Sequence, residues 1–266
     1  NLIEQRAIAD ILSALDEAIM QSESLIQKYQ SIKQGLMADL LTRGVDENGE
    51  LRPSCEDAPE LYRESSLGRL PKTWGVSTLD EQVKIFDCKH FTPKFVNRGF
   101  AFIRPRNVKV DGLDFSDINF ISEKDYHFLT DKHKPRKGDI VFSRNASFGT
   151  PCFVSTDTPF AIGQDVVIMT KKKAENLFIY YSLLADTTTR QVQLVSTGST
   201  FGRINLEFIR RIIIPVPEKH EQIIIANLLA DVDYLISTEK TNLGKLQLLK
   251  YGLMQDLLSG QVRVKV

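Results

Sequence analysis

The stretch KQGLMADLL at residues 33–41 is nearly repeated as KYGLMQDLL at residues 250–258. When residues 4–42 are laid over residues 221–259 without a gap, roughly four positions in ten are identical. An ungapped match of this length between distant parts of one 266-residue chain indicates an internal repeat. We therefore expect the two copies to form the same structure.

Apolar residues recur in each copy with alternating steps of four and three, which is the spacing of a coiled-coil seam of about five heptads. Both seams are interrupted at the same two places, by Ser22 and Glu239 and by Lys33 and Lys250. Polar residues inside a seam fix register and partner at a cost in stability, so we predict that the two helices recognise each other. The apolar seam positions are Ile8, Leu12, Leu15, Ile19, Ile26, Leu36 and Leu40 in the first copy and Ile225, Leu229, Val232, Ile236, Leu243, Leu253 and Leu257 in the second.

Glycines follow the last apolar residues of both copies, at Gly44 and Gly260, and suit helix C-caps. A helix of about 40 residues is a rod roughly 60 Å long. A plain dimerisation coiled coil or a pair of core helices would show the same pattern. The function therefore has to be argued from the middle of the chain.

Composition describes a chain able to bury a core, with 42% hydrophobic and 26% charged residues. No apolar run approaches the roughly 20 residues that span a bilayer, and the first residues do not resemble a signal peptide. The three cysteines form no CxxC pair, which argues against a zinc ribbon and a disulfide framework. We therefore expect a soluble, cytoplasmic protein. Because the net charge is zero, a nucleic-acid partner has to be argued from local clusters.

The middle of the chain has the composition of an α+β domain. Residues 45–66 are polar and rich in turn formers, and strand-like runs follow at residues 100–103, 139–143, 152–154 and 161–169. A helix is predicted at residues 175–195, and a second, short one after Asn205, whose side chain can cap it. The predicted organisation is a helix over 1–44, a linker over 45–66, a domain over 67–219 and a second helix over 220–266.

Catalytic motifs are absent from the sequence, which contains no GxGxxG, GxxxxGK[ST], HExxH or GxSxG pattern. Cys88 and His90 lie close in sequence, but catalytic partners are usually distant in sequence. His127, His133 and His220 lack metal-ligand spacing. We therefore predict a non-catalytic chain without a metal site.

Three loops of the predicted domain combine cations with small polar residues. Arginine and lysine can bind guanine or phosphates, asparagine can read adenine, and hydroxyls and glycine backbones can approach phosphates closely. Each loop could instead be an ordinary turn whose polar residues serve backbone geometry. The predicted DNA-binding residues are Lys89, His90, Thr92, Lys94 and Arg98 in the first loop, Arg144, Asn145 and Ser147 in the second, and Ser199, Thr200, Phe201 and Arg203 in the third.

The order of these segments resembles the specificity subunit of type I restriction-modification systems, over almost the whole chain. The resemblance is carried by EQRAIADIL and GLMADLLTRG in the first copy, by LPKTWGVSTL, DCKHFTP, KGDIVFSR and GSTFGRINLEFIRRIIIPVP in the middle, and by EQIIIANLL and GLMQDLLSG in the second copy. It implies a globular α/β target-recognition domain flanked by two long helices that pack as an antiparallel coiled coil. In that family each recognition domain reads one half of a bipartite DNA site, and the helices set the spacing.

The resemblance also implies partners: double-stranded DNA, the modification subunits that methylate it and the restriction subunits that translocate and cut it. S-adenosylmethionine, ATP and magnesium would belong to those partners, with no cofactor in this chain. The order here is helix, domain, helix, and the chain begins at Asn1, so we expect a fragment lacking the first recognition domain. A half-length subunit that forms a homodimer through its helices is one alternative. The others are a protein–protein scaffold without DNA binding and the specificity end of a fused restriction-modification enzyme.

Overall fold

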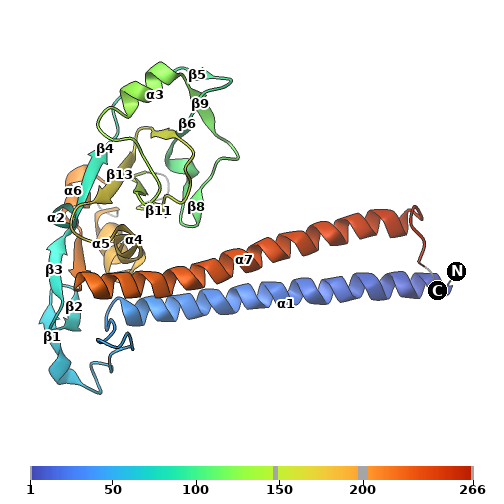
Figure 1. The fold of residues 1–266 in the computed structure, drawn as a ribbon, viewed down its shortest axis with the longest axis horizontal. Coiled ribbons are helices and arrows are strands. Elements are labelled where there is room, and N and C mark those ends of the chain that lie inside the picture. Colours follow the sequence, from blue (N-terminus) through green and yellow to red (C-terminus); the bar gives the residue numbers. More distant parts are fainter. Residues whose placement is uncertain (1, 146–148, 197–202, 265–266) are drawn as a thin grey trace. The chain divides into compact units, whose positions relative to one another are not determined.

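The computed structural model describes residues 2–145, 149–196 and 203–264, and the chain divides into two compact units. Unit 1 combines residues 1–36 with 227–266, and unit 2 spans residues 37–226. Two long helices, α1 (Leu2–Leu40) and α7 (Lys219–Leu258), contribute to both units (Figure 1). Both helices therefore form where the sequence repeat predicts them.

Unit 1 is an antiparallel pair of helices within a single chain, as Figure 1 shows. Lys33 Nζ lies 2.5 Å from Asp233 Oδ1, Ser22 Oγ donates to Glu239 Oε1 at 2.5 Å, and Lys250 pairs with Asp16. Residues nearer the N-terminus of α1 contact residues nearer the C-terminus of α7, so the two helices run antiparallel. Every predicted apolar seam residue of this unit is buried or half-buried. The predicted antiparallel coiled coil is confirmed.

The polar residues of the seam make contacts that are related by approximate two-fold symmetry. Ser22 and Glu239, which are bonded, are 217 positions apart, and this is also the offset between the two repeats. The same offset converts the Lys33–Asp233 pair into the Lys250–Asp16 pair, so one contact is made twice. An interface in which equivalent residues exchange contacts in this way is isologous. The polar positions therefore fix a single register for the two helices.

Unit 2 is built around two four-stranded sheets. The first has the antiparallel order β11-β10-β13-β4, and the second has the order β12-β6-β9-β5, in which only the β12–β6 pair is parallel. Ile103, Val141, Phe160 and Val166 from both sheets share one buried cluster. The strands are β4 (Val83–Asp87), β5 (Phe95–Val96), β6 (Phe100–Ile103), β9 (Asn119–Ile121), β10 (Ile140–Ser143), β11 (Pro151–Phe153), β12 (Phe160–Ile162) and β13 (Val166–Lys171).

Short elements complete unit 2. Three two-stranded sheets pair β1 (Tyr62–Ser65) with β2 (Gly68–Pro71), β3 (Gly75–Thr78) with β14 (Ile213–Val216), and β7 (Val108–Lys109) with β8 (Gly112–Leu113). The helical elements are η1 (Pro59–Leu61), α2 (Leu79–Gln82), η2 (Pro105–Asn107), α3 (Glu123–Leu129), α4 (Asn176–Leu184), α5 (Asp186–Ser196) and α6 (Leu206–Arg211). The mixture of helices and strands agrees with the predicted α+β class.

Two predicted elements of unit 2 are divided in the structure. The run at 161–169 forms parts of β12 and β13, because Asp165 between them adopts the left-handed φ of 65°. The helix expected at 175–195 is broken at Ala185, whose ψ of 149° is extended. The short helix after Asn205 is confirmed, since Asn205 Oδ1 accepts the N–H of Phe208 at 2.9 Å.

Residues 45–66, expected to form a linker, are more ordered than a linker requires. They include β1, and the side chains of Val45, Ala58 and Tyr62 are buried. The hydroxyl of Tyr62 donates to the carbonyl of Pro53 at 2.5 Å. Polar composition was a misleading signal here, because a few apolar residues are enough to pack this segment into unit 2.

Candidate nucleic-acid interface

The three loops predicted to bind DNA meet at the side chain of Arg144, which follows β10. Its Nη1 donates to Asp87 Oδ1 at 2.9 Å, and its Nε donates to the carbonyl of Ile204 at 2.9 Å. Its backbone N–H donates to the carbonyl of Asp165 at 2.7 Å, and its own carbonyl accepts the N–H of Ile204 at 2.9 Å. Asp87 precedes the first loop and Ile204 ends the third. Arg144, at the start of the second loop, thus connects a residue that borders the first loop with one at the end of the third.

The role predicted for Arg144 needs correction. We expected a direct DNA contact, but its side chain is only 7% exposed and is already bonded to Asp87 and Ile204. Removing it would leave a carboxylate and a carbonyl without their partner inside the fold, which is costly. In this structure Arg144 therefore positions the loops and does not present its guanidinium to a ligand.

Asp165 organises the outer edge of the same junction. Arg203 Nε lies 2.6 Å from Asp165 Oδ1, and Asn145 Nδ2 donates to Asp165 Oδ2 at 3.3 Å. Asn145 is half-buried, whereas the side chain of Arg203 is 40% exposed. Of the predicted residues near the junction, Arg203 therefore has the more accessible cation. Ser147, Ser199, Thr200 and Phe201 lie outside the described residues.

In the first loop, Lys89 is paired with an acidic residue, and several other polar residues are exposed. Lys89 Nζ lies 2.6 Å from Asp131 Oδ2 and 3.9 Å from the ring centroid of Phe128. The bond from Lys89 holds the pKa of Asp131 below its usual value. The remaining predicted residues of this loop are all exposed: His90, Thr92, Lys94 and Arg98. Within the described part of the chain, neither Lys94 nor Arg98 has an acidic partner, so both charges are available to a ligand.

Sequence reasoning missed a basic run in the segment KHKPRK at residues 132–137. The side chains of Lys132, Lys134, Arg136 and Lys137 are exposed, and we call these four residues the basic ridge. The signal was four cations in six residues, a charge block that can mark a nucleic-acid contact. The segment was judged only on the ligand spacing of His133, so its charge pattern was overlooked.

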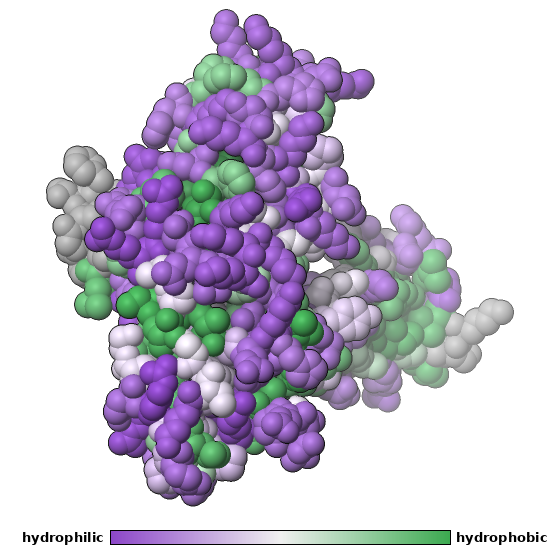
Figure 2. All heavy atoms as spheres, turned by 60° about the vertical axis from the view of Figure 1, so that its left-hand side comes forward, coloured by the Kyte–Doolittle hydropathy of each residue, from purple (hydrophilic) through white to green (hydrophobic). Residues whose placement is uncertain are grey.

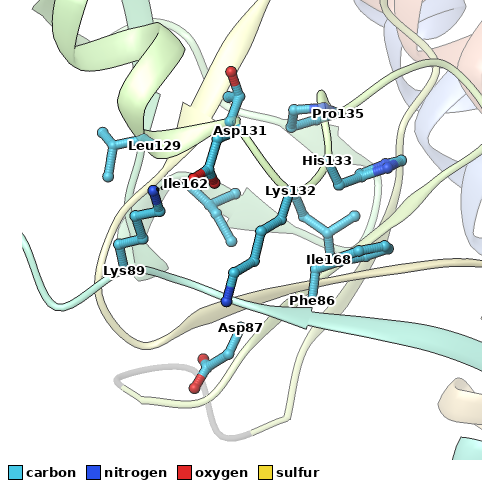
Figure 3. A pocket seen from close by; sticks show the side chains of 11 residues that line it. Phe86, Asp87, Lys89, Leu129, Asp131, Lys132, His133, Pro135, Ile162 and Ile168 are labelled. Carbon is cyan, nitrogen blue, oxygen red and sulfur yellow. Dashed lines mark hydrogen bonds and ion pairs between the residues drawn. The ribbon is translucent and has the colours of Figure 1, made fainter.

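A small hollow separates the first loop from the basic ridge. It is lined by residues that include Asp87, Lys89, Asp131, Lys132 and His133, and Figure 3 shows their side chains around it. Its volume of about 20 Å³ holds roughly one water molecule, so it is not a pocket for a metabolite.

Two cysteines of the described residues are buried among groups that disfavour their thiolates. Burial raises the pKa of the Cys152 thiol to about 12, and burial together with the nearby Asp87 raises that of Cys88. A thiol whose pKa is raised is a weaker nucleophile at neutral pH, which argues against Cys88 as an activated nucleophile beside His90. In the ranges that the structure describes, no three His, Cys, Asp or Glu residues are grouped to hold a metal ion, and no helix combines the length and apolar character of a membrane span.

Comparisons with known proteins agree on one family. Residues 71–248 match the family model described as the type I restriction modification DNA specificity domain. The chain is 27% identical over 272 residues to the MjaVIII type I restriction enzyme specificity subunit of Methanocaldococcus jannaschii, covering 99% of this chain and 61% of that protein. It is 26% identical to the putative MjaX specificity subunit of the same organism, covering 99% of this chain and 58% of that protein. The chain thus spans about six-tenths of the length of these relatives.

Solved structures show the same fold. The type I restriction-modification S subunit from M. genitalium superposes with a TM-score of 0.64 at 18% identity, covering 97% of this chain and 61% of that one. The HsdS subunit from Thermoanaerobacter tengcongensis gives a TM-score of 0.54 at 17% identity, covering 97% of this chain and 59% of that one. At these identities the likeness concerns the fold alone.

Proposed function

Because this chain belongs to the family of type I restriction modification DNA specificity domains, we propose that unit 2 reads one half of a bipartite DNA site. The observation that carries the proposal is the junction at Arg144, which links described residues that border the polar loops. Groups that are already held in place lose less entropy on binding, which suits recognition.

Contacts to DNA are proposed for two exposed residues of the first loop and for two residues beside the junction. Lys94 and Arg98 carry charges without acidic partners among the described residues and suit phosphate contacts. Arg203 and Asn145 are held by Asp165, and their residue types can bind guanine and adenine edges respectively. Figure 2 shows one face of the protein, on which hydrophilic residues predominate and hydrophobic residues lie between them.

The helices of unit 1 are proposed to set the distance between half-sites and to dock modification subunits. Their antiparallel pairing fixes one register, as a spacer of constant length requires. In this proposal the chain itself is non-catalytic and works in the cytoplasm. Methylation with S-adenosylmethionine is left to the modification subunits, and ATP-dependent translocation and cleavage with magnesium to the restriction subunits.

A selection experiment tests the proposal. The full chain is incubated with a pool of randomised duplexes at low salt, and bound DNA is sequenced over several rounds. We expect a short enriched motif that represents one half-site, with affinity falling as salt rises. Binding without any enriched motif would reject sequence reading, and absence of binding would favour a protein–protein scaffold.

A second experiment addresses assembly with the modification subunits. The chain is combined with them, and methylated adenines are mapped on genomic DNA. A palindromic split motif would support two copies that each read one half-site. DNA binding without methylation would support a chain that needs a second recognition domain.

A further inference from the structure

We propose that the basic ridge, formed by Lys132, Lys134, Arg136 and Lys137, grips the phosphate backbone of DNA next to the half-site without reading its bases. The inference rests on the proposed function and adds to it a division of labour within unit 2. The junction at Arg144 would hold the reading loops, and the ridge would supply affinity that does not depend on sequence.

No cation of the ridge forms an ion pair within the described residues. All four side chains are exposed. Of the two acids that border the segment, Asp131 is bonded to Lys89 at 2.6 Å and also interacts with the charge of Lys132, whereas Asp139 is bonded to the ring of His133 at 2.7 Å. Several other cations of unit 2, such as Arg144 and Arg203, lie against acids. The ridge is therefore a local concentration of positive charge on a chain whose net charge is zero.

The backbone of the ridge is also held in place by contacts that His133 and Arg136 make with the domain. The ring of His133 stacks on Phe86 with centroids 4.7 Å apart, and its Nε2 lies 2.7 Å from Asp139 Oδ2. The same carboxylate oxygen accepts the backbone N–H of Arg136 at 3.0 Å. Pro135 is buried, so exposed cations alternate with inward-facing residues from 132 to 136. A run of lysines that served only solubility would not need this anchoring, and a fixed backbone lowers the entropy lost on binding.

The ridge is continuous with the face proposed to read DNA. The Lys89–Asp131 bond connects the first loop to the residue that precedes the ridge. Lys89, Asp131 and Lys132 line the same hollow, as Figure 3 shows. Asp87, also on this hollow, is bonded to Arg144 at the loop junction. Because DNA is a long polymer, a duplex held at the loops continues past them, and neighbouring cations can bind its phosphates.

The test compares two double variants that remove the same charge. Lys134→Ala with Arg136→Ala removes two ridge cations, and Lys28→Ala with Lys245→Ala removes two exposed lysines of unit 1. Binding of the full chain to a duplex carrying its enriched motif is measured by fluorescence anisotropy between 50 and 200 mM salt. Each lost phosphate contact lowers the slope of log affinity against log salt by about 0.9. We expect a decrease of roughly 1.8 for the ridge variant and almost none for the control.

Four results are possible, and they bear differently on this inference and on the proposed function. If the ridge variant shows the lower salt slope and selects the same motif, the ridge contacts phosphates. The variant Lys134→Arg with Arg136→Lys keeps both charges and should therefore retain the wild-type slope. If the wild-type chain binds DNA and the ridge variant keeps its slope, the ridge inference is overturned alone. An altered motif would overturn it too, since the ridge would then read bases. If the wild-type chain does not bind DNA, both the inference and the proposed function fail.

Discussion

Glu4 and Glu221 occupy the same position of the sequence repeat but have different surroundings. In unit 2, both carboxylate oxygens of Glu221 bind Arg52, and the group also accepts the N–H of Val45 at 3.0 Å and the indole N–H of Trp74 at 3.1 Å. In unit 1, Glu4 accepts from Arg263 at 2.5 and 2.7 Å. The side chain of Arg263 is 73% exposed, whereas that of Arg52 is 16% exposed.

The comparison shows what the repeat alone provides. Each glutamate lies in the first turn of its helix, where a negative charge is favoured. Its arginine partner follows a glycine of positive φ, Gly44 before Arg52 and Gly260 before Arg263. The two arginines do not occupy equivalent positions of the repeat, because Arg52 lies eight residues after Gly44 and Arg263 lies three residues after Gly260. Both glutamate side chains are 10% exposed, and Trp74 of unit 2 adds an indole N–H to the network at Glu221.

The largest expected effect comes from Glu221→Ala. The substitution leaves the guanidinium of Arg52 and the N–H groups of Trp74 and Val45 without their carboxylate in a buried site. We expect a loss of about 3–5 kcal/mol in the free energy of unfolding of unit 2. Urea unfolding followed by tryptophan fluorescence measures it, since Trp74 is the single tryptophan of the chain. Glu4→Ala is the matched control with a smaller effect, and equal effects would contradict the comparison.

Gly44→Ala and Gly260→Ala separate backbone strain from crowding. Both glycines have left-handed φ values, 65° and 76°, which cost an L-residue about 1–2 kcal/mol. A Cβ at Gly44 would overlap Glu221 and Trp74, whereas a Cβ at Gly260 meets nothing within 4 Å. We therefore expect Gly260→Ala to show only the backbone cost and Gly44→Ala clearly more. Urea unfolding of both variants measures the loss in the free energy of unfolding. Similar losses would mean that the side chains around Glu221 move to accommodate the added methyl group.

Sequence predicted the parts of this molecule that depend on periodicity. The seam residues and the polar interruptions Ser22 and Glu239 could be predicted because a coiled coil repeats its contacts along the chain. The burial of Arg144 was not legible, since its partners Asp87 and Ile204 are distant in sequence and its residue type suits a DNA contact equally well. Likewise, nothing in the local sequence distinguishes Glu221 from Glu4. The difference arises from Trp74, which only folding brings to one of them.

Trp74→Phe should make the Glu221 site more like the Glu4 site. Phenylalanine keeps an apolar ring in this buried position but removes the indole N–H that donates to the carboxylate. A hydrogen bond to a charged group contributes roughly 1.5–3 kcal/mol, and we expect a loss of that order. Unfolding is followed by far-ultraviolet circular dichroism, because the fluorophore is gone. In a cycle with Glu221→Gln, the two losses should not add, and simple additivity would show that Trp74 acts through packing alone.

The smallest expected effect is the acid sensitivity of Glu4. The bond from Arg263 lowers the pKa of Glu4 in the folded protein. A glutamate whose folded pKa lies below its unfolded value stabilises the fold above the unfolded pKa, and this contribution is lost as pH falls through the folded pKa. Wild type should therefore melt at a higher temperature than Glu4→Gln at pH 7, and the difference should shrink under acid conditions. Because Arg263 is exposed, added salt should shrink the difference at pH 7 as well. If the difference in melting temperature persisted at low pH and high salt, Glu4 would stabilise unit 1 by packing. Glu4 and Glu221 would then share a position in the repeat but not an electrostatic role.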